Sequence, residues 1–157
     1  MKIHLWSIGK AHESYVKEGI EDFTNRIGKY YPVQWRVFSP ARQTANSVEA
    51  DIKKHEAHSI LNQLQKEDYL VLLDEKGKQL SSTQLATFLE QRANSSVRQL
   101  VFLVGGAFGV DEILKSRANY TWSLSHLVFP HQLVRLILAE QIYRACTIIR
   151  NEKYHHE

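Results

Sequence analysis

The spacing of apolar residues changes several times along the chain, and each change predicts a switch between strand and helix. Residues 2–8 have the composition of a strand, which Gly9 ends. From residue 14 the apolar positions recur at spacings of four, three and four, as on one face of a helix that stops at Gly28. Those positions are Val16, Ile20, Phe23 and Ile27. Residues 33–37 then alternate between apolar and polar, which predicts a strand with one wet face.

Polar residues at a fixed spacing mark two helix starts. Asn46 lies three residues before Glu49, a capping pattern that predicts a helix start after a polar loop over residues 39–45. Ser81 and Gln84 repeat the pattern and predict a second start. The apolar stripe of the first of these helices comprises Val48, Ile52, Ala57, Ile60, Leu61 and Leu64.

Two further apolar segments, residues 69–73 and 100–104, predict buried strands. The first is followed by a predicted turn over residues 74–77. The second is the most apolar strand of the chain, as expected in the middle of a parallel sheet. Because strands and helices alternate throughout, we predict an α/β fold with a mostly parallel sheet flanked by helices, in a single domain over residues 1–157.

The composition narrows the class of protein without naming an activity. The 157 residues are 43% hydrophobic and 24% charged, which is typical of a soluble globular domain, and no apolar run is long enough to span a membrane. Met1 leads directly into strand-like sequence, so no signal peptide is expected, and Cys146 has no second cysteine to pair with. These features predict a cytoplasmic protein. A net charge of +3 with eight histidines fits either a polyanionic partner or an ordinary, slightly basic enzyme.

Two loops follow predicted strands at the ends where open α/β sheets bind ligands. Gly105, Gly106 and Gly109 come directly after the most apolar strand, without the dinucleotide fingerprint or the P-loop spacing. They fit a close approach of the backbone to a ligand, and they also fit a plain tight turn. The loop over residues 125–130, which follows a further predicted strand, can offer backbone groups to a purine ring or serve only as a connector.

The helix that begins near residue 131 is apolar nearly all round between residues 133 and 139, except for Arg135. Such a helix is buried on more than one side. Nothing after it in the sequence could cover the second side except a partner subunit, so we predict a homodimer through this C-terminal helix. Glu140 and Arg144 fit an ordinary helix pair. Arg135 needs a partner, and both an interface contact and an RNA contact are open.

The terminal residues 151–157 are aromatic and titratable, and on their own they fit a frayed terminus. His55 with His58, and His155 with His156, lack the companion cysteines or acids of a metal site, so no metal is expected. No serine-histidine-acid or cysteine-histidine set is legible either.

Taken together, several motifs resemble the bacterial 23S rRNA pseudouridine-N3 methyltransferases, a family of the SPOUT class. The motifs are Gly105-Gly106-x-x-Gly109, the run from Leu124 to Gln132, Glu-Gln-x-Tyr-Arg-Ala at 140–145, the terminal Tyr154-His155, the opening Lys-Ile-x-Leu-x-x-Ile-Gly-Lys, and the segment from Leu73 to Ser82. Motifs in this density and order are specific, and the resemblance covers the whole chain.

The resemblance implies a C-terminal deep trefoil knot, an obligate homodimer, and S-adenosylmethionine held in the knot as methyl donor. The implied substrate is a pseudouridine of 23S rRNA, methylated at N3 within the assembled ribosome, with no membrane involved. Carried over by motif, the cofactor contacts fall on Leu73, Gly105, Leu124, Ser125, His126, Leu127, Val128 and Phe129.

The terminal Tyr154 and His155 match the family's Tyr-His and are our candidates for shaping the pocket of the reacting base. Arg135, Arg144 and His156 are candidate substrate contacts. His156 stands where family members commonly carry Arg or Lys, which weakens the case for a phosphate contact there. Two other hypotheses compete: a ribosome-binding factor that keeps the fold without catalysis, and a dinucleotide-dependent reductase, which the missing fingerprint disfavours.

Overall fold

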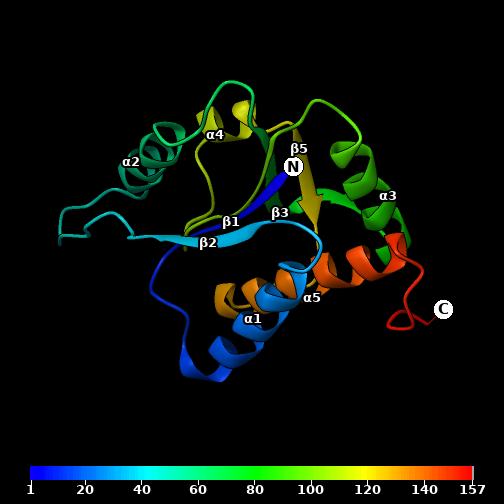
Figure 1. Cartoon of the computed structure of the whole chain (residues 1–157). Coiled ribbons are helices and arrows are strands. Elements are labelled where there is room, and N and C mark those ends of the chain that lie inside the picture. The colour runs from blue at the N-terminus through cyan, green and yellow to red at the C-terminus, as the bar shows by residue number, and fades with distance from the viewer. Residues whose placement is uncertain (157) are drawn as a thin grey trace.

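A computed structural model describes residues 1–156 of the chain (Figure 1). Its five strands form one parallel sheet in the order β2-β1-β4-β3-β5. The strands are β1 (Lys2–Ile8), β2 (Val33–Phe38), β3 (Tyr69–Gln79), β4 (Gln99–Val104) and β5 (Tyr120–Ser123). The helices are α1 (Ser14–Ile27), α2 (Glu49–Leu61), α3 (Ser82–Ala93), α4 (Glu112–Arg117) and α5 (His131–Ile149). The predicted α/β fold with a mostly parallel sheet is confirmed.

Helices cover both faces of this sheet, with α2 and α4 on one face and α1, α3 and α5 on the other (Figure 1). Successive residues of a strand therefore enter different cores. In β4, Phe102 packs into the core under α3 and α5, whereas Leu103 packs into the core under α2 and α4. Because both faces of β4 are covered, the strand must be apolar along its length, as its sequence predicted.

The capping patterns had different outcomes. The Ser81 hydroxyl accepts a hydrogen bond from the N–H of Gln84, and the Gln84 side chain accepts one from the N–H of Ser81, so the predicted box at the start of α3 is confirmed. The predicted cap at Asn46 is wrong. Helix α2 begins at Glu49, and the preceding turn is closed by Ser47, whose hydroxyl accepts a hydrogen bond from the N–H of Thr44.

Strand β3 is longer than the sequence predicted. It continues to Gln79, where a turn over residues 74–77 was expected. Both Leu73 and Lys78 pair with Trp122 of β5, so the register shifts and the four residues between them leave the ladder. The polar composition that suggested a turn instead belongs to a wide bulge in the strand.

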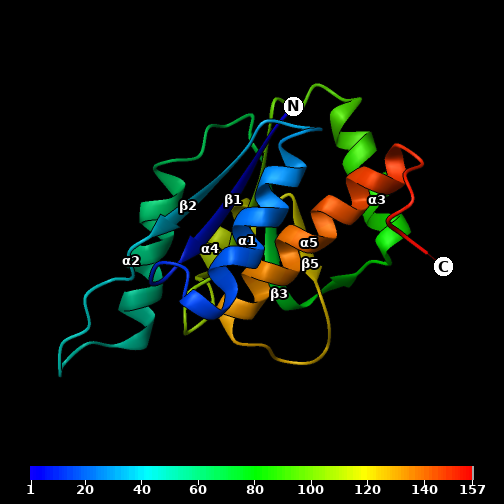
Figure 2. The same cartoon turned by 60° about the horizontal axis from the view of Figure 1, so that its bottom comes forward.

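Helix α5 lies beside α1 and α3 on its face of the sheet (Figure 2). These two helices cover much of the apolar surface that the sequence assigned to a partner subunit. Both precede α5 in the chain, whereas the prediction counted only residues C-terminal to it. Leu133, Val134, Leu136 and Ile137 remain half-buried. The homodimer stays a prediction, and so does the trefoil knot.

Candidate functional site

A cavity of about 490 Å³ opens at the carboxyl ends of β3, β4 and β5. Its wall is formed by the β3 bulge, the glycine loop after β4, and the chain from Trp122 to Val134. The residues predicted to contact the cofactor that line this wall are Leu73, Gly105, Leu124, Ser125, Leu127, Val128 and Phe129. His126 belongs to the same loop but does not line the cavity. The structure thus brings together three segments that the sequence had related only by motif.

The three glycines of the loop after β4 differ in what a side chain would meet. Gly109 has a φ of +82°, a conformation that disfavours a side chain although no atom lies within 4 Å of a Cβ built there. Gly106 lies outside the left-handed region, but its Cβ would lie 2.6 Å from Oε2 of Glu56. A Cβ at Gly105 would meet Val110 at 3.5 Å, an ordinary contact. The backbone at Gly105 is therefore free to serve a ligand in the cavity.

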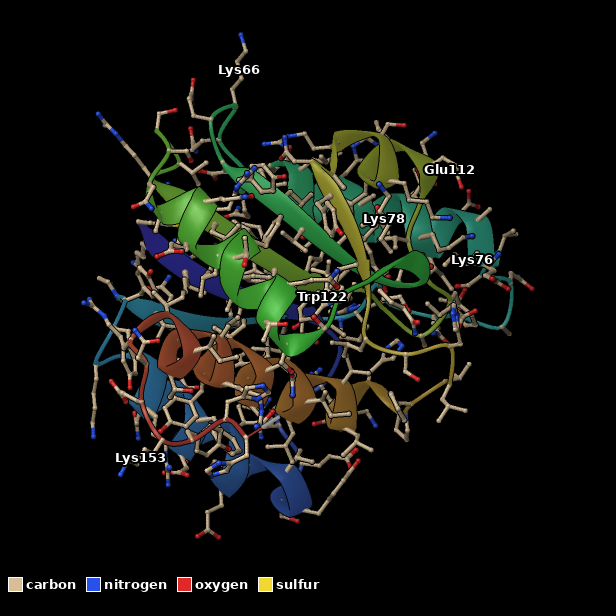
Figure 3. The ribbon with its side chains drawn as sticks, turned by 90° about the vertical axis from the view of Figure 1, so that its right-hand side faces the viewer. Lys66, Lys76, Lys78, Glu112, Trp122 and Lys153 are labelled. Carbon is tan, nitrogen blue, oxygen red and sulfur yellow. The ribbon has the colours of Figure 1, made fainter. Side chains whose placement is uncertain are left out.

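Charged side chains of both signs surround the mouth of the cavity. Lys53, Lys76 and Lys115 come from α2, the β3 bulge and α4, and Asp74 and Glu75 lie among them. Lys115 is paired with Glu112 of its own helix at 3.0 Å. Figure 3 shows Lys76 and Glu112 on the same side of the molecule, near the end of β3. Because it carries both lysines and acids, the rim can pair with both charges of a zwitterionic ligand and is not a purely basic surface.

Arg135 lies in the first turns of α5 and is 1% exposed. Its guanidinium donates hydrogen bonds to the Ser7 hydroxyl at 2.8 Å and to the Lys10 carbonyl at 2.8 Å, and it lies 3.3 Å from Nδ1 of His12. Burial lowers its pKa. These contacts tie α5 to the loop after β1. The enclosure of the guanidinium by its own chain satisfies its need for a partner, and the RNA contact stays a prediction.

Residues 151–156 of the terminal segment fold back on α5 and are not frayed. Tyr154 donates a hydrogen bond to Oε1 of Glu140 at 3.0 Å, and its ring packs 4.7 Å from that of Tyr143. Arg144 bridges the same carboxylate at 2.6 Å and lies 3.3 Å from Nδ1 of His155. Burial, followed by the hydrogen bond to Glu140, raises the pKa of Tyr154. We call these four residues, Glu140, Arg144, Tyr154 and His155, the tail cluster.

The cavity and the tail cluster are at opposite ends of α5. His131 and Val134 in its first turn line the cavity, whereas no residue after Val134 does so in the described chain. The rise of a helix puts Arg144 about 20 Å beyond His131 along the axis. Figure 3 shows the same separation, with Lys76 of the bulge and Lys153 of the tail on opposite sides. His156 follows the cluster as an exposed residue.

Sequence reasoning missed several residues of the cavity wall. These include Lys53, Lys115 and Trp122, for which no motif in the sequence indicated a role. His131 could have been found, because it directly follows the proline of a loop already suspected. Burial and then the nearby Arg135 lower the pKa of His131, which favours the neutral ring beside the cavity.

Comparison with known proteins assigns the family. The family model described as "Predicted SPOUT methyltransferase" matches residues 1–155. The chain belongs to the SPOUT methyltransferase family. It is 46% identical over 157 residues to a protein of Parabacteroides distasonis, with 100% of both chains covered. It is 42% identical over 156 residues to one of Cytophaga hutchinsonii, covering 99% of this chain and 100% of the relative. Both relatives are named ribosomal RNA large subunit methyltransferase H.

Two further structural findings on this SPOUT methyltransferase concern metal-binding groups and membrane-spanning helices. Within residues 1–156, no group of three or more His, Cys, Asp and Glu side chains is arranged to hold a metal ion. Of the helices described there, none has the length and apolar character needed to cross a membrane.

Proposed function

We propose that this chain methylates N3 of a pseudouridine in 23S rRNA, with S-adenosylmethionine as the methyl donor and the assembled ribosome as the substrate. The observation that carries the proposal is the cavity at the carboxyl edge of the sheet. Seven of the eight residues chosen by motif line it, in a chain whose family model spans residues 1–155. The names of the relatives support ribosomal RNA as the substrate.

The cavity suits this cofactor in size and in chemistry. Its volume of about 490 Å³ lies within the usual range for small-molecule sites. Leu73, Leu124 and Phe129 supply apolar wall for a purine, the glycine loop supplies close backbone, and the charged rim suits an amino acid group. When bound, S-adenosylmethionine supplies an electrophilic methyl group, so the protein's main contribution is to hold the reacting atoms in line.

The tail cluster carries groups that can stabilise the pseudouridine ring as it reacts. Before N3 can attack the methyl group, it must give up its proton to water or to a side chain that accepts it, and the imide anion that forms needs stabilisation. Tyr154 keeps its proton and can donate a hydrogen bond, and Arg144 brings a cation beside it. We assign to Tyr154 and His155 the role of contacting the nucleobase, and to Arg144 the role of stabilising the negative charge that develops on it.

A homodimer brings these two halves together. Because the tail cluster lies about 20 Å from the cavity along α5, it cannot reach a methyl group held in the cavity of its own chain. We propose that the tail of one protomer completes the cavity of its partner, in the cytoplasm where ribosomes are assembled.

Isolated ribosomes test the activity. Purified protein is incubated with the labelled methyl donor and ribosomes from a strain that lacks the gene, and rRNA nucleosides are then analysed by mass spectrometry. We expect one 3-methylpseudouridine per 23S rRNA, with free 23S rRNA reacting far more slowly. Calorimetry with S-adenosylmethionine tests the competing hypothesis of a ribosome-binding factor without catalysis. Such a factor binds no cofactor and transfers no label.

A further inference from the structure

Glu56 is a buried carboxylate that neither the cavity lining nor the tail chemistry explains. It lies in α2 with 7% of its surface exposed, and no cation forms an ion pair with it within residues 1–156. Oε1 accepts one hydrogen bond, at 3.3 Å, from the backbone N–H of Ala41. Burial raises the pKa of this carboxyl, against smaller opposing effects of the Ala41 N–H and His55. A group that is so costly to bury calls for a specific role.

The carboxylate of Glu56 lies directly behind the glycine loop. A Cβ on Gly106 would lie 2.6 Å from Oε2, 3.3 Å from Cδ and 3.4 Å from Oε1. Gly106 itself lines the cavity, so the carboxylate contacts a residue of the cavity wall. Lys53, one turn earlier in α2, lines the cavity directly. Helix α2 therefore backs the loop, and Glu56 is the side chain that touches it.

We propose that Glu56 is a positioning residue for the cofactor: its carboxylate sets the depth of the glycine loop and so fixes the wall against which S-adenosylmethionine binds. The inference rests on the proposed function, which assigns the cavity to that cofactor. Position 106 is then a glycine because of Glu56, since its own φ lies outside the left-handed region. The Ala41 N–H orients the carboxylate and joins the polar loop over residues 39–45 to the same contact.

Variants that add volume at Gly106 and remove it at Glu56 test this role. Gly106→Ala forces a methyl group against the carboxylate and pushes the loop toward the ligand. Glu56→Ala leaves a gap behind the loop. We expect each variant to weaken S-adenosylmethionine binding about tenfold in calorimetry. In the double variant the methyl group occupies the space that the carboxylate vacated, and affinity should return to within about threefold of the wild type.

Two further variants separate shape from charge. Glu56→Gln keeps the length of the side chain and should bind the cofactor within about twofold of the wild type. Glu49→Gln removes the same charge from an exposed position in α2 and should change nothing. Urea unfolding of each cofactor-free variant confirms that affinities are compared between folded proteins. A loss of stability alone cannot produce recovery in the double variant.

Two results overturn the inference while the proposed function stands. One is a double variant that binds no better than its weaker parent. The other is wild-type affinity in Glu56→Ala, which decides the matter even if Gly106→Ala fails to fold. A wild-type protein that binds no S-adenosylmethionine is a different outcome, because it removes the proposed function together with the assignment of the cavity.

Discussion

The two ends of α5 differ in whether their side chains are bonded to one another or left open to a ligand. At the first end the cavity is open, and Leu127 and Val128 beside it are 69% and 79% exposed. At the other end Glu140 accepts hydrogen bonds from both Arg144 and Tyr154, and the cluster is closed on itself. The first region offers surface to a ligand that the chain itself does not supply. The second is ordered by its own contacts.

This difference shows how the chain divides its work. A methyl transfer requires the donor and acceptor atoms to approach within about 3.5 Å, yet the two regions are separated by most of a helix. A rigid α5 keeps them apart within one chain. Our account therefore predicts that changes in the cavity alter cofactor affinity and that changes in the tail cluster alter turnover alone.

The largest effect is expected at the tail. Tyr154→Ala or His155→Ala should lower the rate of methylation about 100-fold, because each removes a group that we assign to the nucleobase. The affinity for S-adenosylmethionine should stay at the wild-type value, since both residues are assigned to the nucleobase and neither lines the cavity of its own chain. Ribosome methylation assays and calorimetry measure the two quantities. Unchanged turnover in both variants would remove the assignment of the tail.

Arg135 holds the cavity end of α5 in place, and we expect its loss to affect the fold. Arg135→Ala leaves the Ser7 hydroxyl and the Lys10 carbonyl without their donor, and the free energy of unfolding should fall by about 2 kcal/mol. Arg150→Ala, at an exposed position just after α5, is the matched control and should stay within about 0.5 kcal/mol of the wild type. Urea titration measures both. Equal stability of the two variants would contradict the structural role.

Gly105 should affect the cavity without affecting the tail. Gly105→Val places its Cβ at an ordinary contact distance from Val110. Its branched side chain occupies part of the cavity, so cofactor affinity should fall about tenfold. Circular dichroism of the tail aromatics should not change. A variant that binds the cofactor normally would place the ligand elsewhere.

The smallest effect concerns pH. Burial and the proximity of Arg135 hold the pKa values of His12 and His131 below their ordinary value of 6.5. As the pH falls, these histidines therefore take up protons in the unfolded chain before they do so in the folded chain. Their contribution to the free energy of unfolding is fully present above pH 6.5 and is lost as the pH drops through the lowered pKa values. Unfolding experiments at pH 7.5 and pH 5.5 should show this loss, with a shallower slope in His131→Gln. Identical slopes would mean that His131 does not contribute.

Much of the fold could be predicted because local pattern and global topology agree. The all-apolar β4, the alternating β2 and the capping box at Ser81 are short-range features that tertiary contacts reinforce. The turn predicted at residues 74–77 failed because polar composition does not distinguish a chain reversal from a bulge. Which helices flank α5 depends on long-range packing and could not be read from its own residues.

The cavity was predictable only in part. Glycines after a buried strand pointed to it, and the family resemblance supplied the loop from Leu124 to Phe129. Lys53 and Glu56 could not be found, because their role depends on α2 crossing behind a loop about 50 residues later in the chain. Arg135 was rightly singled out as needing a partner, and the structure gives it a hydroxyl and a carbonyl of its own chain.

The most direct test of the account mixes two impaired chains, at a concentration of S-adenosylmethionine well below the weakened Kd of Gly105→Val. Gly105→Val has a damaged cavity and an intact tail, and Tyr154→Ala has the reverse. The two proteins are unfolded together, refolded as random dimers and assayed on ribosomes with S-adenosylmethionine. If the tail of one protomer serves the cavity of its partner, each mixed dimer has one intact site, and activity should recover to about a quarter of the wild-type value. Activity no higher than that of the separate variants would contradict the account.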